Sequence, residues 1–282
     1  AGKLKQELKS KGKNREVLKN KTLAMIFEKP SLRTRVSFET GMTQLGGHAI
    51  FLGPNDIQMG KRETPRDVAR NLERMVDIIM ARVFEHEKLV DLSEGTKIPV
   101  INALSDLEHP CQVLADLLTV KEHKGELKGL KLAFVGDAQN NVTHSLALIC
   151  DALDMEFACA APKGYWMKEE IIKKLKREIF QTTDPKKAVK DADVVVTDTW
   201  VSMGDEKEKK KRLKVFPPYQ VNKKLMALAH KDAIFMHCLP AYRGYEVTDE
   251  VIDGPQSVVF DEAENRLHAQ KALMLHTLRI QY

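Results

Sequence analysis

The feature that most constrains the fold is a regular alternation of short apolar runs with amphipathic segments from Thr22 onward. Runs such as 22–27, 78–82 and 194–198 suit buried strands, whereas the segments between them repeat apolar residues at helical spacing. Strands that alternate with helices predict parallel sheets with helices on both faces. We therefore expect an α/β fold.

The expected elements follow this alternation along the whole chain. We expect strands at 22–27, 49–52, 78–82, 100–101, 131–137, 157–160, 194–198 and 234–237, and helices after Pro30, at 65–75, from 110 onward, and at 141–153, 169–176, 223–229 and 265–278. The connection between 176 and 184 is short, which indicates an abbreviated strand or missing residues. We interpret the lysine-rich N-terminus as a solvated helix and 207–214 as a mobile charged loop.

The polar segment 121–129, which contains two glycines, is the candidate domain boundary. A length of 282 residues, of which 43% are hydrophobic, is enough for two domains that each bury a core. The net charge of +5 comes from 45 basic and 40 acidic residues, so it indicates a mixed surface rather than a nucleic-acid footprint. We expect no nucleic-acid partner.

The sequence shows no clear signal for membrane insertion, secretion or disulfide bonding. No apolar stretch approaches the roughly 18 residues that cross a bilayer, and the N-terminus lacks a secretory core, so we expect no membrane association. The four widely spaced cysteines suit reduced thiols. We expect a cytoplasmic protein, with the mitochondrial matrix as the alternative if the N-terminus, which opens at Ala1 within a helical pattern, is processed.

The segment Ser31-Leu32-Arg33-Thr34-Arg35 joins a predicted strand to a predicted helix. A helix N-terminus favours an anion, and two hydroxyl and two guanidinium groups add charge-assisted donors. The segment reads as a phosphate cradle. The alternative is an ordinary capped helix start with solvated arginines.

Other polar clusters also follow predicted strands. In open parallel sheets, ligands bind beyond the carboxyl ends of the strands. These positions hold Ser31 to Arg35, Arg82, His109 to Gln112, Gly136 to Asn141, Asp198 to Gly204, and His237 to Pro240. One shared cleft would collect them.

Taken in order, these clusters resemble the transcarbamylase family. The motifs are Ser31-Leu32-Arg33-Thr34-Arg35, Ala81-Arg82-Val83, His109-Pro110-Cys111-Gln112, Gly136-Asp137 with Asn140-Asn141, Asp198-Thr199-Trp200-Val201-Ser202-Met203-Gly204, His237-Cys238-Leu239-Pro240 and Glu262-Ala263-Glu264-Asn265-Arg266. The resemblance runs from about Leu18 to about Leu273 and is greatest to the ornithine carbamoyltransferases.

The resemblance implies a carbamoyl-phosphate-binding domain over 1–122, joined by a C-terminal helix, 264–282, that packs back on it, and an ornithine-binding domain over 123–263. It implies transfer of the carbamoyl group from carbamoyl phosphate to the δ-amino group of L-ornithine, which gives L-citrulline and phosphate, in arginine biosynthesis or the urea cycle. No cofactor and no metal are expected, and the nine histidines show no ligand spacing.

The resemblance also assigns the donor site. It implies catalytic roles for Arg82, His109, Gln112, Cys238 and Arg266, and carbamoyl-phosphate contacts from these residues together with Ser31, Leu32, Arg33, Thr34, Gln58 and Leu239. The reaction needs preorganised donors where negative charge develops, first on the carbonyl oxygen and then on the phosphate. Taken alone, Arg82 could form a surface ion pair and His109 could cap a helix.

The resemblance places the α-amino and α-carboxylate groups of ornithine against Asn141, Asp198, Ser202 and Met203. The charged segment after Met203 suits a lid that excludes water. Cys238 and the carbonyl of Leu239 would surround the δ-amine. A cysteine beside a histidine suggests covalent catalysis, but an uncharged amine attacks without an acyl-enzyme, and a buried structural thiol is the other reading.

Gln58 belongs to a polar loop, 54–61, that crosses to a neighbouring subunit's active site in this family. The resemblance therefore implies a homotrimer or a multiple of one. Leu32 departs from the commonest form of the first motif, which has Thr there, so one hydroxyl is missing.

Four alternatives remain. Leu32 also occurs in relatives that carbamoylate N-acylated ornithine, although the 198–204 segment suits a free α-amino group. Aspartate as the acceptor would call for cationic partners in that segment, which has none. A nucleotide-binding module is prompted by 134–137 but lacks the glycine pattern. A polyanion-binding protein built on the basic runs would bind nucleic acid with steep salt dependence.

Overall fold

The computed structural model describes residues 1–202 and 206–282, and the chain divides into two compact units. Unit 1 comprises Ala1–Leu118 and Glu264–Tyr282, and unit 2 comprises Thr119–Ala263. Both units are α/β with parallel sheets flanked by helices, which confirms the predicted fold class. The helix over 110–124 is continuous, so the break predicted from 121 begins only after Lys124.

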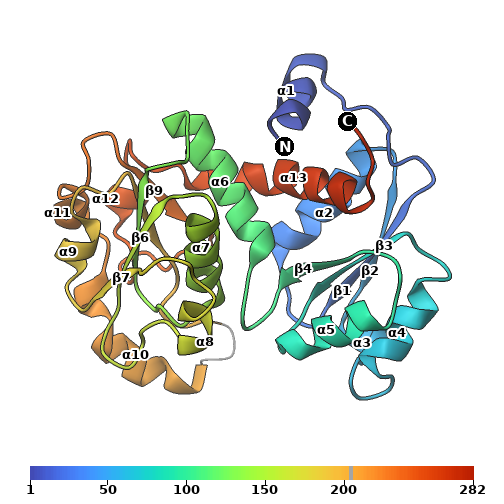
Figure 1. The fold of residues 1–282 in the computed structure, drawn as a ribbon, viewed down its shortest axis with the longest axis horizontal. Coiled ribbons are helices and arrows are strands. Elements are labelled where there is room, and N and C mark those ends of the chain that lie inside the picture. The colour runs from blue at the N-terminus through green and yellow to red at the C-terminus, as the bar shows by residue number, and fades with distance from the viewer. Residues whose placement is uncertain (203–205) are drawn as a thin grey trace. The chain divides into compact units, whose positions relative to one another are not determined.

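Unit 1 contains a 4-stranded sheet in the order β2-β1-β3-β4, in which every neighbouring pair is parallel (Figure 1). The strands are β1 (Thr22–Phe27), β2 (His48–Leu52), β3 (Ile78–Arg82) and β4 (Val100–Leu104). The helices are α1 (Gly2–Lys11), α2 (Leu32–Gln44), α3 (Pro54–Ile57), α4 (Pro65–Leu72), α5 (His86–Glu94), most of α6 (Pro110–Lys124) and most of α13 (Val259–Thr277).

The continuous apolar run of β1 is explained by burial on both of its faces. Leu23 and Met25 pack in one cluster with residues of α2, α6 and α13, whereas Ala24 and Ile26 pack in another with residues of α4 and α5. Alternate residues of a strand point to opposite faces, so both faces of the sheet need apolar side chains. The C-terminal helix packs back on this unit, because Gly41 of α2 lies against side chains of α13.

Unit 2 contains a 5-stranded parallel sheet in the order β7-β6-β5-β8-β9. Its strands are β5 (Lys131–Val135), β6 (Glu156–Ala160), β7 (Phe180–Thr182), β8 (Val194–Thr197) and β9 (Ile234–His237). Its helices are α7 (Asn141–Ala152), α8 (Glu169–Ile172), α9 (Pro185–Val189), α10 (Lys209–Val215), α11 (Lys223–Met226) and α12 (Asp249–Ile252), with short 3-10 helices η1 (Glu206–Glu208) and η2 (Pro217–Tyr219). The strand β7 is the abbreviated strand between 176 and 184.

Several boundaries differ from the sequence-based expectation. Helices α3, α5, α9 and α12 were not expected, and α8 and α11 are shorter than predicted. The last helix begins at Val259 rather than near Asn265. Its first turn carries Asp261 and Glu262, whose charges suit a helix N-terminus.

The segment 207–214 is not a loop, because α10 occupies residues 209–215. Arg212 is buried, and its Nη1 donates to Asp137 Oδ2 at 2.5 Å and to the Trp200 carbonyl at 3.1 Å. Its guanidinium carbon also lies 5.0 Å from the ring centroid of Tyr165. A single buried arginine within a run of solvated lysines therefore anchors the helix, which charge density alone does not indicate.

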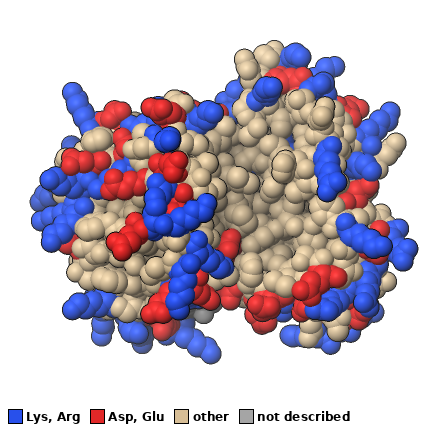
Figure 2. Space-filling model, in the orientation of Figure 1, with Lys and Arg blue, Asp and Glu red and all other residues tan. Residues whose placement is uncertain are grey.

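The surface matches the mixed charge of the sequence. Figure 2 shows Lys and Arg interspersed with Asp and Glu over one face of the molecule. Among the described residues, no helix combines the length and the apolar composition that crossing a bilayer requires.

Replacing Arg212 with Ala should lower the free energy of unfolding by about 3–5 kcal/mol, because the buried carboxylate of Asp137 would lose its charged partner. Chemical denaturation measures this change. The exposed Lys210 offers a matched control on the same helix, and its replacement with Ala should change the stability by no more than about 0.5 kcal/mol. Equal effects of the two changes would contradict the anchoring role.

Candidate functional site

In unit 1, several of the predicted donor residues lie at or beyond the carboxyl ends of neighbouring strands. Ser31 follows β1 and caps α2, where its Oγ accepts a hydrogen bond from the Thr34 N–H at 3.2 Å. Arg82 is the last residue of β3, and His109 directly precedes α6. The parallel register of β1 and β3 brings these ends together.

Three guanidinium groups act on the buried imidazole of His109. The pKa of His109 is held well below its usual value, first by burial and then by the positive charges of Arg266, Arg82 and Arg33. The imidazole is therefore neutral at pH 7. The arginines carry the positive charge of this cluster, and a neutral imidazole can still donate one N–H.

Arg266 joins the first turn of α2 to the first turn of α6. Its Nη1 donates to Gln112 Oε1 at 2.6 Å and its Nη2 to Thr34 Oγ1 at 3.2 Å. Gln112 Nε2 in turn donates to Asp116 Oδ1 at 2.8 Å. Thr34, Gln112 and Arg266 are all almost completely buried. Unit 1 thus presents a preorganised cationic cluster that suits an anionic ligand.

Two predicted donor-site residues are exposed. Leu32 is the first residue of α2, and 73% of its surface is accessible. Gln58 ends the short helix α3 with a left-handed backbone, at φ 51°, and its side chain is exposed. Neither side chain belongs to the buried cluster, so a contribution from Leu32 would come from its backbone N–H at the helix start.

In unit 2, Asp198 follows β8 as a buried carboxylate. Its Oδ1 accepts hydrogen bonds from the Thr199 N–H at 2.7 Å and from Cys238 Sγ at 3.2 Å, and Asn140 Nδ2 lies 3.4 Å from Oδ2. Burial raises the pKa of Asp198 above its usual value, although His237, Cys238 and Thr199 oppose this effect. A cationic group would be a favourable further partner for this carboxylate.

The remaining predicted acceptor residues lie near the same sheet edge. Asn141 is the first residue of α7 and is half-buried, next to Asn140, whose side chain caps the helix. Ser202 is half-buried in the segment after Asp198. Met203 lies outside the described residues. Sequence reasoning gave no separate role to Asn140, although it stands in the motif.

The Cys238–Leu239 turn after β9 depends on a buried pair that sequence reasoning missed. His237 Nε2 lies 3.2 Å from Glu246 Oε1, and both residues are fully buried. The Leu239 N–H donates to His237 Nδ1 at 2.9 Å, so this nitrogen is the acceptor and Nε2 carries the hydrogen. The pair fixes Leu239 in its left-handed conformation, with φ 55°. The only sequence signal was the histidine within the motif.

The described residues include one group of side chains that could hold a metal ion. It comprises Asp198, His237 and Cys238, whose ligand atoms lie within 4.8 Å of one another. Both ring nitrogens of His237, however, already have hydrogen-bond partners. The geometry therefore offers little to a metal, and the metal-free, cofactor-free site stays a prediction.

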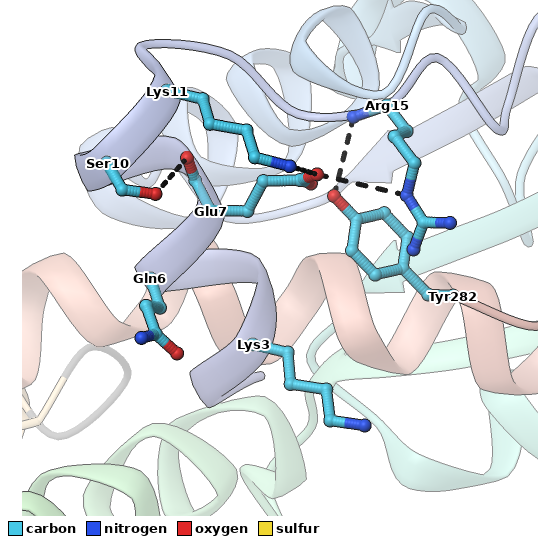
Figure 3. A pocket seen from close by; sticks show the side chains of 7 residues that line it. All are labelled: Lys3, Gln6, Glu7, Ser10, Lys11, Arg15 and Tyr282. Atoms are coloured by element: carbon cyan, nitrogen blue, oxygen red, sulfur yellow. Dashed lines mark hydrogen bonds and ion pairs between the residues drawn. The ribbon is translucent and has the colours of Figure 1, made fainter.

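A separate pocket lies between α1 and Tyr282 (Figure 3). Within it, Glu7 pairs with Lys11 Nζ at 3.3 Å and with Arg15 Nε at 3.9 Å. The Tyr282 hydroxyl accepts from the Arg15 N–H at 3.4 Å, and the Arg15 guanidinium covers the tyrosine ring. These hydrogen bonds and ion pairs connect α1 to the C-terminal segment. The pocket contains none of the predicted site residues.

Comparison with known proteins identifies the family of the chain. Residues 1–122 match the family described as "Aspartate/ornithine carbamoyltransferase, carbamoyl-P binding domain", and residues 128–277 match its "Asp/Orn binding domain". The chain belongs to the aspartate/ornithine carbamoyltransferase family. The sequence-based resemblance is thereby confirmed.

Relatives in this carbamoyltransferase family are similar along almost their entire length. The ornithine carbamoyltransferase of Methanobrevibacter smithii is 56% identical over 93% of this chain and 89% of that protein. The anabolic ornithine carbamoyltransferase of Pyrococcus furiosus is 53% identical over 93% of this chain and 85% of that protein. A solved structure of ornithine carbamoyltransferase from P. furiosus, 52% identical, superposes with a TM-score of 0.93 and covers 97% of this chain and 89% of that chain.

In this carbamoyltransferase, a thiol reagent should label Cys238 first among the four cysteines. Cys111, Cys150 and Cys159 are buried, and burial raises the pKa values of Cys111 and Cys159 to about 12, whereas Cys238 is partly exposed. Mass spectrometry of the native protein after brief labelling identifies the site, and unfolding in urea should expose the other three. Faster labelling of a buried cysteine in the native protein would contradict this description of the site.

Proposed function

We propose that this chain transfers the carbamoyl group of carbamoyl phosphate to the δ-amino group of L-ornithine, giving L-citrulline and phosphate. Family membership and relatives that are named ornithine carbamoyltransferases support this reaction. The observation that carries the choice of acceptor is the buried carboxylate of Asp198 next to the Cys238 thiol. The segments 198–202 and 237–240 contain no Lys or Arg that would pair with a second carboxylate such as that of aspartate.

The predicted division assigns carbamoyl phosphate to 1–122 together with 264–282, and ornithine to 123–263. The phosphate binds at the start of α2, where the N–H groups and the helix dipole favour an anion. It is held there by Ser31, the backbone of Leu32, Arg33 and Thr34. Gln112 and Arg266, which are already hydrogen-bonded to each other, approach the phosphate and the carbonyl oxygen together with the residues Arg82 and His109.

The neutral state of His109 suits a hydrogen-bond donor to the carbonyl oxygen. As the amine attacks, negative charge develops first on that oxygen and then on the departing phosphate. His109 donates its N–H while Arg82, Arg33 and Arg266 supply the positive field. Each such donor contributes on the order of 3 kcal/mol to lowering the barrier.

Asn141, Asp198, Ser202 and Met203 bind the α-amino and α-carboxylate end of ornithine. The Cys238 side chain and the Leu239 carbonyl surround the δ-amine. The amine nitrogen forms a bond to the carbonyl carbon while the bond from that carbon to the phosphate oxygen breaks. The departing phosphate takes the proton that the nitrogen loses. The Cys238 thiol donates to Asp198, which suits a positioning role and requires no acyl-enzyme.

An assay with four acceptors tests the proposed reaction. With carbamoyl phosphate present, ornithine should give the highest kcat/KM, and N-acetylornithine, putrescine and aspartate should be at least about 100-fold poorer. N-acetylornithine has lost the charge on its α-nitrogen, putrescine lacks the α-carboxylate, and aspartate lacks the δ-amine and carries a second carboxylate. Product formation is measured as the ureido compound. Preference for N-acetylornithine would move the assignment to the N-acylornithine enzymes.

Replacing Asp198 with Asn should raise KM for ornithine by about 10- to 100-fold and leave KM for carbamoyl phosphate within about twofold, since the variant removes one charge–charge contact. Replacing the surface residue Asp232 with Asn provides a matched control that should change neither value. Equal losses for both substrates in the Asp198 variant would contradict the assignment by domain.

We propose a homotrimer, which exposed apolar side chains on unit 1 support. Leu32 and Val36 lie one turn apart on α2 and are 73% and 51% exposed, and Ile50 on the edge strand β2 is 39% exposed. Exposed apolar groups on neighbouring elements mark an interaction surface. A homotrimer would cover them and would bring the exposed Gln58 of one subunit to the site of its neighbour.

Mixing two inactive variants tests the shared site. Replacing Gln58 with Ala and replacing Arg266 with Ala should each reduce turnover, and dissociating and reassembling them together should restore activity at roughly a quarter of the sites. Sedimentation of each protein verifies the trimer. A monomeric protein, or mixed trimers that stay inactive, would contradict sharing.

The cellular setting is inferred from the reaction. We propose that the enzyme works in the cytoplasm, in arginine biosynthesis, and the relative named anabolic supports the biosynthetic direction. The mitochondrial matrix is the alternative.

A further inference from the structure

A second buried side chain on α13 contacts the guanidinium of Arg266. Gln270 lies four residues after Arg266, so the two share one face of the helix, and Gln270 is completely buried. We assign the Gln270 amide with its oxygen towards the guanidinium, since only this orientation pairs donors with acceptors at both of its ends. Gln270 Oε1 then lies 3.0 Å from Arg266 Nη2 and 3.2 Å from Arg266 Nε. Gln270 thus accepts from two N–H groups of one guanidinium.

The other end of the same amide reaches α2. Gln270 Nε2 lies 2.5 Å from Ser37 Oγ, and this hydroxyl donates to the carbonyl of Arg33 at 2.5 Å. One amide therefore connects Arg266 to the first turn of α2, which also holds Thr34. The connection is entirely within unit 1 and continues from Arg266 through Gln112 to Asp116.

We propose that Gln270 is a positioning residue, which orients the Arg266 guanidinium for carbamoyl phosphate and couples it to the phosphate-binding turn of α2. This inference rests on the proposed role of Arg266. Gln270 itself need not touch the substrate, because its two ends are occupied by Arg266 and Ser37.

The chemistry of the site favours an amide at this position. A buried guanidinium needs acceptors for its N–H groups, and Gln112, Thr34 and Gln270 provide them as neutral oxygens. A carboxylate in place of Gln270 would accept the same bonds but would neutralise the charge that attracts the phosphate. An amide orients the guanidinium and leaves its full charge available.

Steady-state kinetics of Gln270→Leu test the proposal, since leucine fills a similar volume without polar atoms. We expect kcat/KM for carbamoyl phosphate to fall by about 10- to 100-fold, which is the usual range for losing hydrogen bonds to a charged group. KM for ornithine at saturating carbamoyl phosphate should stay within about twofold. A merely structural role would lower the melting temperature without this split between substrates.

Lys271→Met is the matched control. Lys271 is the next residue on α13, is equally buried, and donates to Asn14 at 2.6 Å rather than to the Arg266 region. Its replacement should lower the melting temperature and leave kcat/KM for carbamoyl phosphate within about twofold. If Gln270→Leu gives the same kinetics as Lys271→Met, the positioning role is overturned.

Arg266→Ala and the double variant separate this inference from the proposed site. If Gln270 acts through Arg266, the double variant should be no worse than Arg266→Ala alone, within about twofold. Full additivity of the two losses would show that Gln270 acts independently and would overturn the inference. If Arg266→Ala itself leaves kcat/KM for carbamoyl phosphate unchanged, the proposed donor site is wrong and the positioning role has no basis.

Discussion

Three helices of unit 1 meet at the guanidinium of Arg266, which is buried and so must find its hydrogen-bond acceptors within the protein. It finds them on α2 at Thr34 and on α6 at Gln112, while it is itself carried by α13. The starts of α2 and α6, to which β1 and β4 lead, are thereby held in one arrangement. Without this interaction, the two helix starts would lose a directional link to each other, which apolar packing does not supply.

The two units present opposite charges to their ligands. In unit 1, Arg33, Arg82 and Arg266 surround a neutral imidazole and create a positive environment, whereas unit 2 offers the buried carboxylate of Asp198. A dianionic phosphate suits the first environment, and an amino group suits the second. In the proposed reaction, this separation gives each substrate a site that disfavours the other, because a phosphate beside Asp198 would bring like charges together in a poorly solvated place.

The sequence allowed the prediction of the strands and of the loops that follow them, because buried parallel strands are continuous apolar runs and polar residues stand out at their ends. Thr22–Phe27 and its following Ser31 are examples. Contacts between residues that are distant in sequence were not predictable. Arg212 reaches Asp137 across 75 positions, and nothing in a lysine-rich run distinguishes it.

Residues that support others were also missed. Gln270 stands one turn after Arg266, a spacing that could have suggested contact, but an amide in a helix has many partners available to it. Glu246 gave no signal at all, since only folding brings it within 3.2 Å of His237. Residues whose own side chains can bind a ligand were predictable from the sequence. Residues that only orient a neighbouring side chain, such as Gln270 and Glu246, were not.

The arrangement of unit 1 in two separate stretches of the chain has a consequence for biosynthesis. A ribosome releases the strands and helices up to Leu118 first, then the whole of Thr119–Ala263, and only afterwards the stretch that carries Arg266. The inserted domain can therefore complete its own sheet while the earlier one still waits for its final helix. The cationic cluster is therefore complete only after the inserted domain has been made, because Arg33 and Arg82 precede that domain and Arg266 follows it.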